Sequence, residues 1–290
     1  LITAISYIFL RQNLEVHYSL LLTAFGILII SILSPIVFFK IFKFQNNLHY
    51  NSLYPIVSLL IFLLPVLGNF FEKIFYIYIL LAIFILFNFK IFFKIKINFK
   101  QIAMLFILAF FVSIFLISSI TAAGHINFFI PEQMNLGIMN HDTRFHIAIT
   151  HIIQNFNITS LGTHGYLTLK LHVFVNWYFA SFGNFLDLNP VWVVSGLPFF
   201  LMIPFFLFFL FNSSASLNNY TLKLEHIFLN LVFLIIIISL SGPFANSIFI
   251  SETYLIALTS FLALIPAIFE LKNIIKNKNN VSFFCLFLIS

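Results

Sequence analysis

The stretch NHDTRFHIAITH, residues 140–151, gathers an Asp, an Arg and three His within a chain that is otherwise almost wholly apolar. Asp142 and His146 are four residues apart, so on a helix they share one face. A carboxylate at that spacing can orient or ionise an imidazole, a pairing suited to general acid–base catalysis. Asp142 equally suits the N-cap of a helix that begins at Thr143, and the two roles are compatible.

One side chain in this stretch and two that follow it are suited to binding a phosphate or pyrophosphate. Arg144, one of two arginines in the chain, has a guanidinium that can bind a phosphate bidentately or anchor to lipid headgroups. Lys170 and His172 carry a weaker form of the same argument. Trp177, in a second apolar-rich segment, suits the headgroup depth of a membrane.

Histidines concentrate in residues 122–189, which hold six of the nine. Such a concentration could bind a metal, but His146 and His151 point about 140° apart on an ideal helix. The chain has no HExxH motif, and its single cysteine, Cys285, excludes an intrachain disulfide and a cysteine-based metal cluster. We therefore expect no dedicated metal site and no cofactor, with a divalent metal left open as an alternative.

The composition decides what kind of protein must position these groups. Of the 290 residues, 62% are hydrophobic and 8% charged, and the mean hydropathy is +1.10. A soluble domain carries about 25% charged residues, so this chain cannot cover a water-facing surface. The net charge of +6 comes from lysines beside apolar runs, which argues for orientation in a membrane and against nucleic-acid binding.

Apolar runs of near twenty residues recur along the chain and predict an all-α, polytopic membrane helical bundle. It would have about seven full and two partial spans, with membrane regions at 1–121 and 190–290 around a loop at 122–189. Because both terminal runs are short and the chain starts at Leu1, we expect it to be part of a larger protein. The expected spans are 1–10 (partial), 19–39, 53–70, 74–93, 102–121, 190–211, 226–240, 253–270 and 281–290 (partial).

Positive charge predicts the orientation. If the basic run 90–100 is cytoplasmic, alternation of the spans places ten of the 14 Lys and Arg inside. Arg11, Lys73, Arg144 and Lys170 remain outside, so the loop 122–189 should lie on the extracytoplasmic side of the cell membrane.

The predicted loop is too long for a simple connection, and loops of this length are usually functional or disordered. Its periodicity and aromatic content favour helices. Residues 144–156 place Phe145, Ile149 and Ile152 or Ile153 along one side, and residues 167–186 form a second apolar-rich helix at interface depth. The stretch NITSLGTHGY, 157–166, reads as the turn between them.

The stretch 141–180 resembles a pattern in bacterial polytopic proteins related to the GT-C membrane glycosyltransferases. The matching positions are Asp142, Phe145-His146, Ser160, Gly162, Gly165 and His172. Two features depart from the superfamily: five expected spans precede Asp142, and this acid is single where an adjacent pair is common.

The resemblance implies transfer of a sugar from a polyprenyl-phosphate donor to an acceptor at the outer membrane face. Asp142, oriented with His146, would deprotonate the acceptor, Arg144 and Lys170 would neutralise the leaving phosphate, and the Trp177 helix would form a floor. The partners would be the lipid bilayer and the lipid-linked donor. An O-antigen polymerase or ligase, or a non-catalytic transporter or scaffold, is the alternative.

Single cysteines at Thr163 and Ser247, in a Cys285→Ser background, should react with a membrane-impermeant maleimide in intact cells. A cysteine at Asn277 should not, because the charge bias places it inside. Labelling at Asn277 alone would reverse the orientation.

Overall fold

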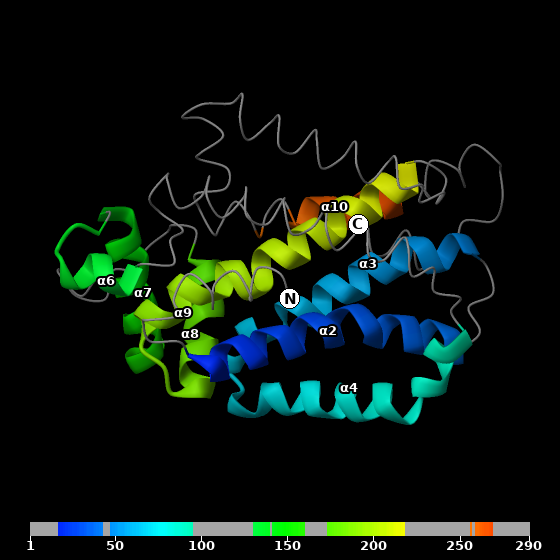
Figure 1. Ribbon diagram of the computed structural model, residues 1–290, viewed down its shortest axis with the longest axis horizontal. Coiled ribbons are helices and arrows are strands. Elements are labelled where there is room, and N and C mark those ends of the chain that lie inside the picture. Colours follow the sequence, from blue (N-terminus) through cyan, green and yellow to red (C-terminus); the bar gives the residue numbers. More distant parts are fainter. Residues whose placement is uncertain are drawn as a thin grey trace.

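The described part of the chain is helical throughout its regular elements, as the predicted all-α class requires. The computed structural model describes residues 17–42, 47–94, 130–139, 141–159, 173–217, 256 and 259–268. Figure 1 shows long helices side by side, with a cluster of shorter helices at one end.

The N-terminal half forms a layer of three helices that alternate in direction (Figure 1). The first helix, α2, packs against both of the others. Short 3₁₀ turns join the second helix to the third and extend the third. The elements are α2 (Tyr18–Ile41), α3 (Asn47–Leu63), η1 (Leu64–Asn69), η2 (Glu72–Phe75), α4 (Tyr76–Phe87) and η3 (Phe89–Lys94).

A second long helical segment comprises α9 (Pro190–Leu197), the π-helical turn η4 (Pro198–Met202) and α10 (Ile203–Leu217). Asn189 caps its start, with its side chain accepting a hydrogen bond from Val191 N at 2.9 Å. Pro190 fits the first position because the N–H that it lacks would have no partner there. Proline further along a helix removes a backbone bond, and the π-helical turn begins at such a residue, Pro198.

Two segments are long and apolar enough to cross a membrane, namely Tyr18–Ile41 and Pro190–Leu210. At 1.5 Å per residue they measure about 36 and 32 Å, against a hydrocarbon core of about 30 Å. A core helix of a soluble protein can meet the same criteria, so the membrane assignment also draws on the low charge content. The two segments run in parallel, because His17 meets Trp192 and Leu20 lies against Gly196.

The remaining expected spans correspond to shorter helices or lie outside the description. Apolar helices at Leu53–Asn69 and Lys73–Phe87 occupy the expected spans 53–70 and 74–93. The first ends one residue early, with its last part in the 3₁₀ turn η1, and the second ends at Phe87, where the 3₁₀ turn η3 follows α4. Only Thr259–Ile268 represents the span 253–270. The expected spans 1–10, 102–121, 226–240 and 281–290 lie outside the described residues.

Aromatic packing joins α3, α10 and the helix α8 (Phe174–Leu186) into one core. The Phe62 ring stacks on Phe205 at 4.2 Å and contacts Tyr178 at 5.5 Å. Tyr178 is fully buried, and its hydroxyl donates to the Phe62 carbonyl at 3.1 Å. Burial, and next the neighbouring Tyr78, raise the pKa of the Tyr178 phenol well above its usual value, so the donor proton is retained.

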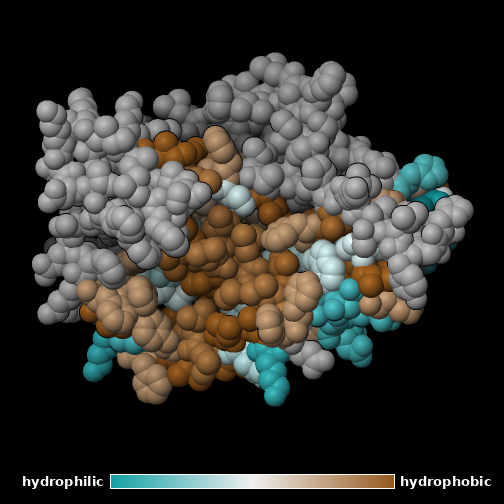
Figure 2. All heavy atoms as spheres, turned by 180° about the vertical axis from the view of Figure 1, so that it is seen from behind, coloured by the Kyte–Doolittle hydropathy of each residue, from teal (hydrophilic) through white to brown (hydrophobic). Residues whose placement is uncertain are grey.

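Large apolar side chains also cover much of the outside of the layer. Figure 2 shows them as a broad apolar expanse across the middle of one face, with hydrophilic atoms at one end and along the lower edge. A surface of this kind suits lipid more than water. The exposed large apolar side chains of α2 and α4 include Leu22, Phe38, Ile79, Leu80, Ile83, Leu86 and Phe87.

The expected loop contains three helices, α6 (Ile130–Asn135), α7 (His141–Phe156) and α8. The predicted apolar side of α7 is confirmed: Ile149 and Ile153 are buried and pack with Phe145 and Ala180. The predicted start at Thr143 is wrong, because α7 already begins at His141 and Asp142 is its second residue. An acidic residue is favourable anywhere in the first turn of a helix, where the helix dipole is positive. The presence of an Asp therefore did not show at which residue α7 begins. Residues 160–172 lie outside the described part of the chain. They include most of the predicted turn 157–166 and the predicted start of the second helix at residue 167.

Gly196 allows α9 to approach α2 closely. A Cβ at this position would lie 2.8 Å from Leu20 Cδ2 and 2.9 Å from Phe200 Cε2, which is closer than such atoms normally approach. We expect Gly196→Ala to lower the free energy of unfolding by about 1–3 kcal/mol, the usual cost of overpacking.

Gly26 is the matched control, since a Cβ there meets no described atom within 4 Å. Gly26→Ala should leave stability unchanged or raise it by up to about 1 kcal/mol, the gain in helix propensity. Thermal unfolding of both variants in detergent would measure the difference. Equal effects would contradict the close α2–α9 contact.

Candidate functional site

Helix α7 carries the chemistry of the predicted stretch and presents it on two sides. One side packs against α8, where Ile149 and Ile153 lie with Ala180 and the half-buried Trp177. The other side borders a groove between α6, α7 and the start of α9. Residues 144 and 146 differ by about 200° around a helix, so they belong to different sides.

His146 faces α8 and meets Asn176. Its Nδ1 lies 3.0 Å from Asn176 Oδ1, across 30 residues of sequence. An amide oxygen only accepts hydrogen bonds, so this contact is a hydrogen bond when the imidazole carries its hydrogen on Nδ1. Asn176 is fully buried, and its Nδ2 has no partner among the described residues. A buried unmet donor costs about 1–3 kcal/mol, so this amide is a polar group whose burial requires an explanation.

The groove on the other side has a volume of about 590 Å³. Its walls are largely apolar, and Arg144 and His151 contribute its titratable side chains. These two residues are seven apart on α7, two turns along the same face. The lining residues are Met134, Gly137, Met139, Arg144, Ile147, Ala148, His151, Asn189, Pro190 and Val191.

Arg144 is exposed, and a single backbone contact holds it at the groove. One guanidinium nitrogen donates to the Gly137 carbonyl at 2.6 Å. Gly137 has φ +72°, in the left-handed region where residues with a Cβ are strained. Because a guanidinium has five N–H donors, this bond leaves others for an anion.

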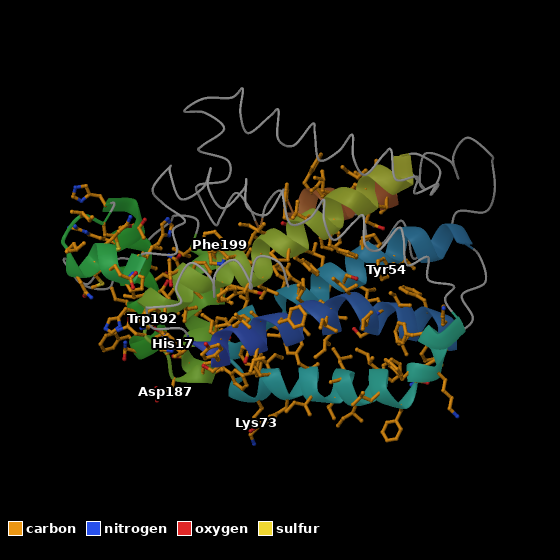
Figure 3. All side chains as sticks on the ribbon, viewed as in Figure 1. His17, Tyr54, Lys73, Asp187, Trp192 and Phe199 are labelled. Atoms are coloured by element: carbon orange, nitrogen blue, oxygen red, sulfur yellow. The ribbon has the colours of Figure 1, made fainter. Side chains whose placement is uncertain are left out.

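The groove borders the beginning of a candidate membrane span. Asn189, Pro190 and Val191 line it, and the Asn189 cap already satisfies the Val191 N–H. Recognition of an anion would therefore depend on Arg144 more than on the amides of α9. The rings of His17 and Trp192 lie 4.4 Å apart at this same end (Figure 3). Trp is enriched where membrane spans meet the membrane surface.

The predicted site residues do not all come together. His146 lies on the α8 side and Arg144 at the groove, while Trp177 stacks on Phe70 at 5.1 Å between near-parallel rings. The backbone of Asp142 belongs to the first turn of α7, but its side chain lies outside the described part, as do Lys170 and His172. Trp177 thus packs against the helical layer and does not line the groove.

Two polar residues of the site were not predicted. Asn176 lies in an apolar segment, and only its long-range contact with His146 distinguishes it. His151 was noted only for its spacing from His146; its seven-residue spacing from Arg144 was the available signal. Among the described residues, no group of three His, Cys, Asp or Glu side chains is close enough to hold a metal ion.

Comparison of the chain with protein-family models, curated proteins and solved structures found no match.

The cap at Asn189 positions one wall of the groove. Asn189→Ala should lower the free energy of unfolding by about 1 kcal/mol, because the Val191 N–H loses its acceptor. Asn189→Asp should retain most of the stability, since a carboxylate also caps well. Chemical denaturation in detergent would compare the variants, and equal losses in both would argue that the cap is not the stabilising contact.

Proposed function

We propose that this chain is a glycosyltransferase-like integral membrane protein. It would transfer a sugar from a polyprenyl-phosphate donor to an acceptor on the extracytoplasmic face. The observation that carries the proposal is the groove of about 590 Å³ at the start of α9, which combines apolar walls with an exposed guanidinium. An amphiphile with a phosphate at the membrane surface needs this combination.

The donor phosphate would bind Arg144. The guanidinium donates to the Gly137 carbonyl and borders the groove, so its remaining N–H groups would bind the phosphate. Met139 and Ile147 form an apolar wall of the same groove. A cation placed where negative charge develops stabilises the leaving group without reorganisation during the reaction. His151, two turns further along the same face, is available to a second phosphate oxygen.

The acid–base group would be Asp142, assisted by His146. Position 142 is one turn before His146 and only two residues before Arg144. Position 142 is on the same side of α7 as position 146, and α7 begins one residue before it, so the reacting sugar would extend from the groove around this end of the helix to reach the carboxylate. The carboxylate would take the proton of the acceptor hydroxyl as its oxygen attacks the anomeric carbon.

The sidedness of the proposal comes from the charge bias. Both candidate spans begin at the end of the molecule that holds the groove (Figure 1), which is compatible with one outer face for the start of both. In that arrangement Lys40, at the end of α2, lies on the opposite, cytoplasmic side.

Asp142→Asn should reduce sugar transfer in proteoliposomes by roughly 10²–10⁴-fold, the usual contribution of a general base. Because position 142 lies in the first turn of α7, the lost charge should cost at most about 1 kcal/mol of helix-dipole stabilisation, and folding and insertion should be retained. Full activity in this variant would restrict Asp142 to a structural role.

Arg144→Lys should weaken binding of the polyprenyl-phosphate sugar roughly tenfold, since lysine keeps the charge but loses the bidentate fork. Lys73→Gln is the control: it removes an exposed cation that does not line the groove, and donor binding should not change. The measurement is equilibrium binding of the donor to purified protein.

These assays also separate the rival functions. Donor binding without transfer to any acceptor would favour a transporter or scaffold. Transfer of preassembled oligosaccharide, with no transfer of single sugars, would favour an O-antigen polymerase or ligase. Equal loss of binding in Arg144→Lys and Lys73→Gln would remove the groove from the proposal.

A further inference from the structure

Asn176 is a fully buried amide in an otherwise apolar helical segment. Its neighbours Val175, Tyr178 and Phe179 are all buried. The one polar contact of its side chain within the described residues is the 3.0 Å approach of Oδ1 to His146 Nδ1. An apolar residue of similar size would fill the same space without leaving Nδ2 unpartnered, so the His146 contact is what the amide contributes.

We propose that Asn176 is a positioning residue that holds His146 in the neutral tautomer with its hydrogen on Nδ1. In water the neutral imidazole favours the other tautomer, so a specific acceptor is needed to select this one. With Nδ1 protonated, the lone pair of Nε2 is free to accept a proton. This role rests on the proposed sugar transfer and refines its chemistry.

The neutral amide matters as much as its position. A buried carboxylate beside Nδ1 would favour imidazolium, which has no lone pair with which to accept a proton. An amide oxygen selects the tautomer without adding charge. His146 therefore stays available as a base, and this availability is what the proposed reaction requires.

The proton balance of the reaction then closes. The acceptor hydroxyl loses its proton to Asp142, and its oxygen bonds to the anomeric carbon. The bond from that carbon to the phosphate oxygen breaks, and polyprenyl phosphate leaves with the electron pair. The proton passes from Asp142, one helical turn away, to Nε2 of His146 and from there to solvent.

Hydrogen bonds near Asn176 and His146 also stabilise the backbone that carries this pair. The Asn69 amide donates to the carbonyl of Trp177, the residue after Asn176, at 2.6 Å. The Tyr178 hydroxyl donates to Phe62 O, so α8 is fixed on both sides of the pair. On α7, the Thr150 hydroxyl donates to the His146 carbonyl at 2.8 Å. The bond on α7 lies within that helix, so it is α8 that these contacts anchor to the helical layer.

The tautomer can be observed directly. In full-length protein labelled with ¹⁵N-histidine, long-range ¹H–¹⁵N correlation spectra distinguish a protonated from an unprotonated ring nitrogen, and His146→Gln assigns the signal. In the unaltered protein His146 should carry its hydrogen on Nδ1. Asn176→Leu should shift it to Nε2, whereas Asn176→Asp, which adds a carboxylate, should favour imidazolium with hydrogens on both ring nitrogens.

Asn155→Leu is the matched control, because Asn155 lies exposed beside His151 and its loss should leave the His146 signal unchanged. In the transfer assay, Asn176→Leu should lower kcat roughly 10- to 100-fold with KM unchanged. A hydrogen on Nε2 in the unaltered protein, or an Asn176→Leu variant with full kcat, would overturn the proposal. If the tautomer is as expected but no sugar is transferred, the transferase function fails and with it the catalytic role of Asn176.

Discussion

An apolar body offers its backbone few hydrogen-bond partners, so a carbonyl that leaves the regular helical pattern needs a donor from elsewhere. The end of α3 is such a place, because the helix tightens there into η1. Tyr178 from α8 supplies the donor to Phe62 O, and Asn69 of η1 donates in return to the carbonyl of Trp177. These reciprocal bonds fix α8 across the helical layer. The packing of α7 on α8, and hence the groove, depends on them.

The consequence for function is a helix whose two sides have different tasks. On the α8 side, the partly buried His146 contacts the buried Asn176. On the groove side, Arg144 is exposed. Charges interact more strongly where fewer water molecules surround them, while binding from the membrane surface needs an exposed group. One amphipathic helix provides both environments within a single turn.

Periodicity in the sequence was enough to predict the helical class, the segments near 19–39 and 190–211, and the buried side of α7. It was not enough to predict where α3 would tighten, because Pro65 and Gly68 lie within an unbroken apolar run. The spacing of residues 144 and 146 also predicts that they cannot share a helical face, so their separation onto two sides of α7 was predictable from the sequence. The contact of His146 with Asn176 was beyond reach, since it depends on how α8 crosses α7 and not on any local pattern.

The π-helical turn at Pro198–Met202 has a geometric effect on the whole bundle. It accommodates one extra residue, so every side chain after it is rotated by about 100° relative to an uninterrupted helix. Before the turn, the segment directs Gly196 at α2; after it, the segment directs Phe205 and Phe208 at α3. A regular helix would keep a single stripe facing one neighbour along its full length. The inserted residue rotates the contact face of the segment, so that its first part packs against α2 and its later part packs against α3.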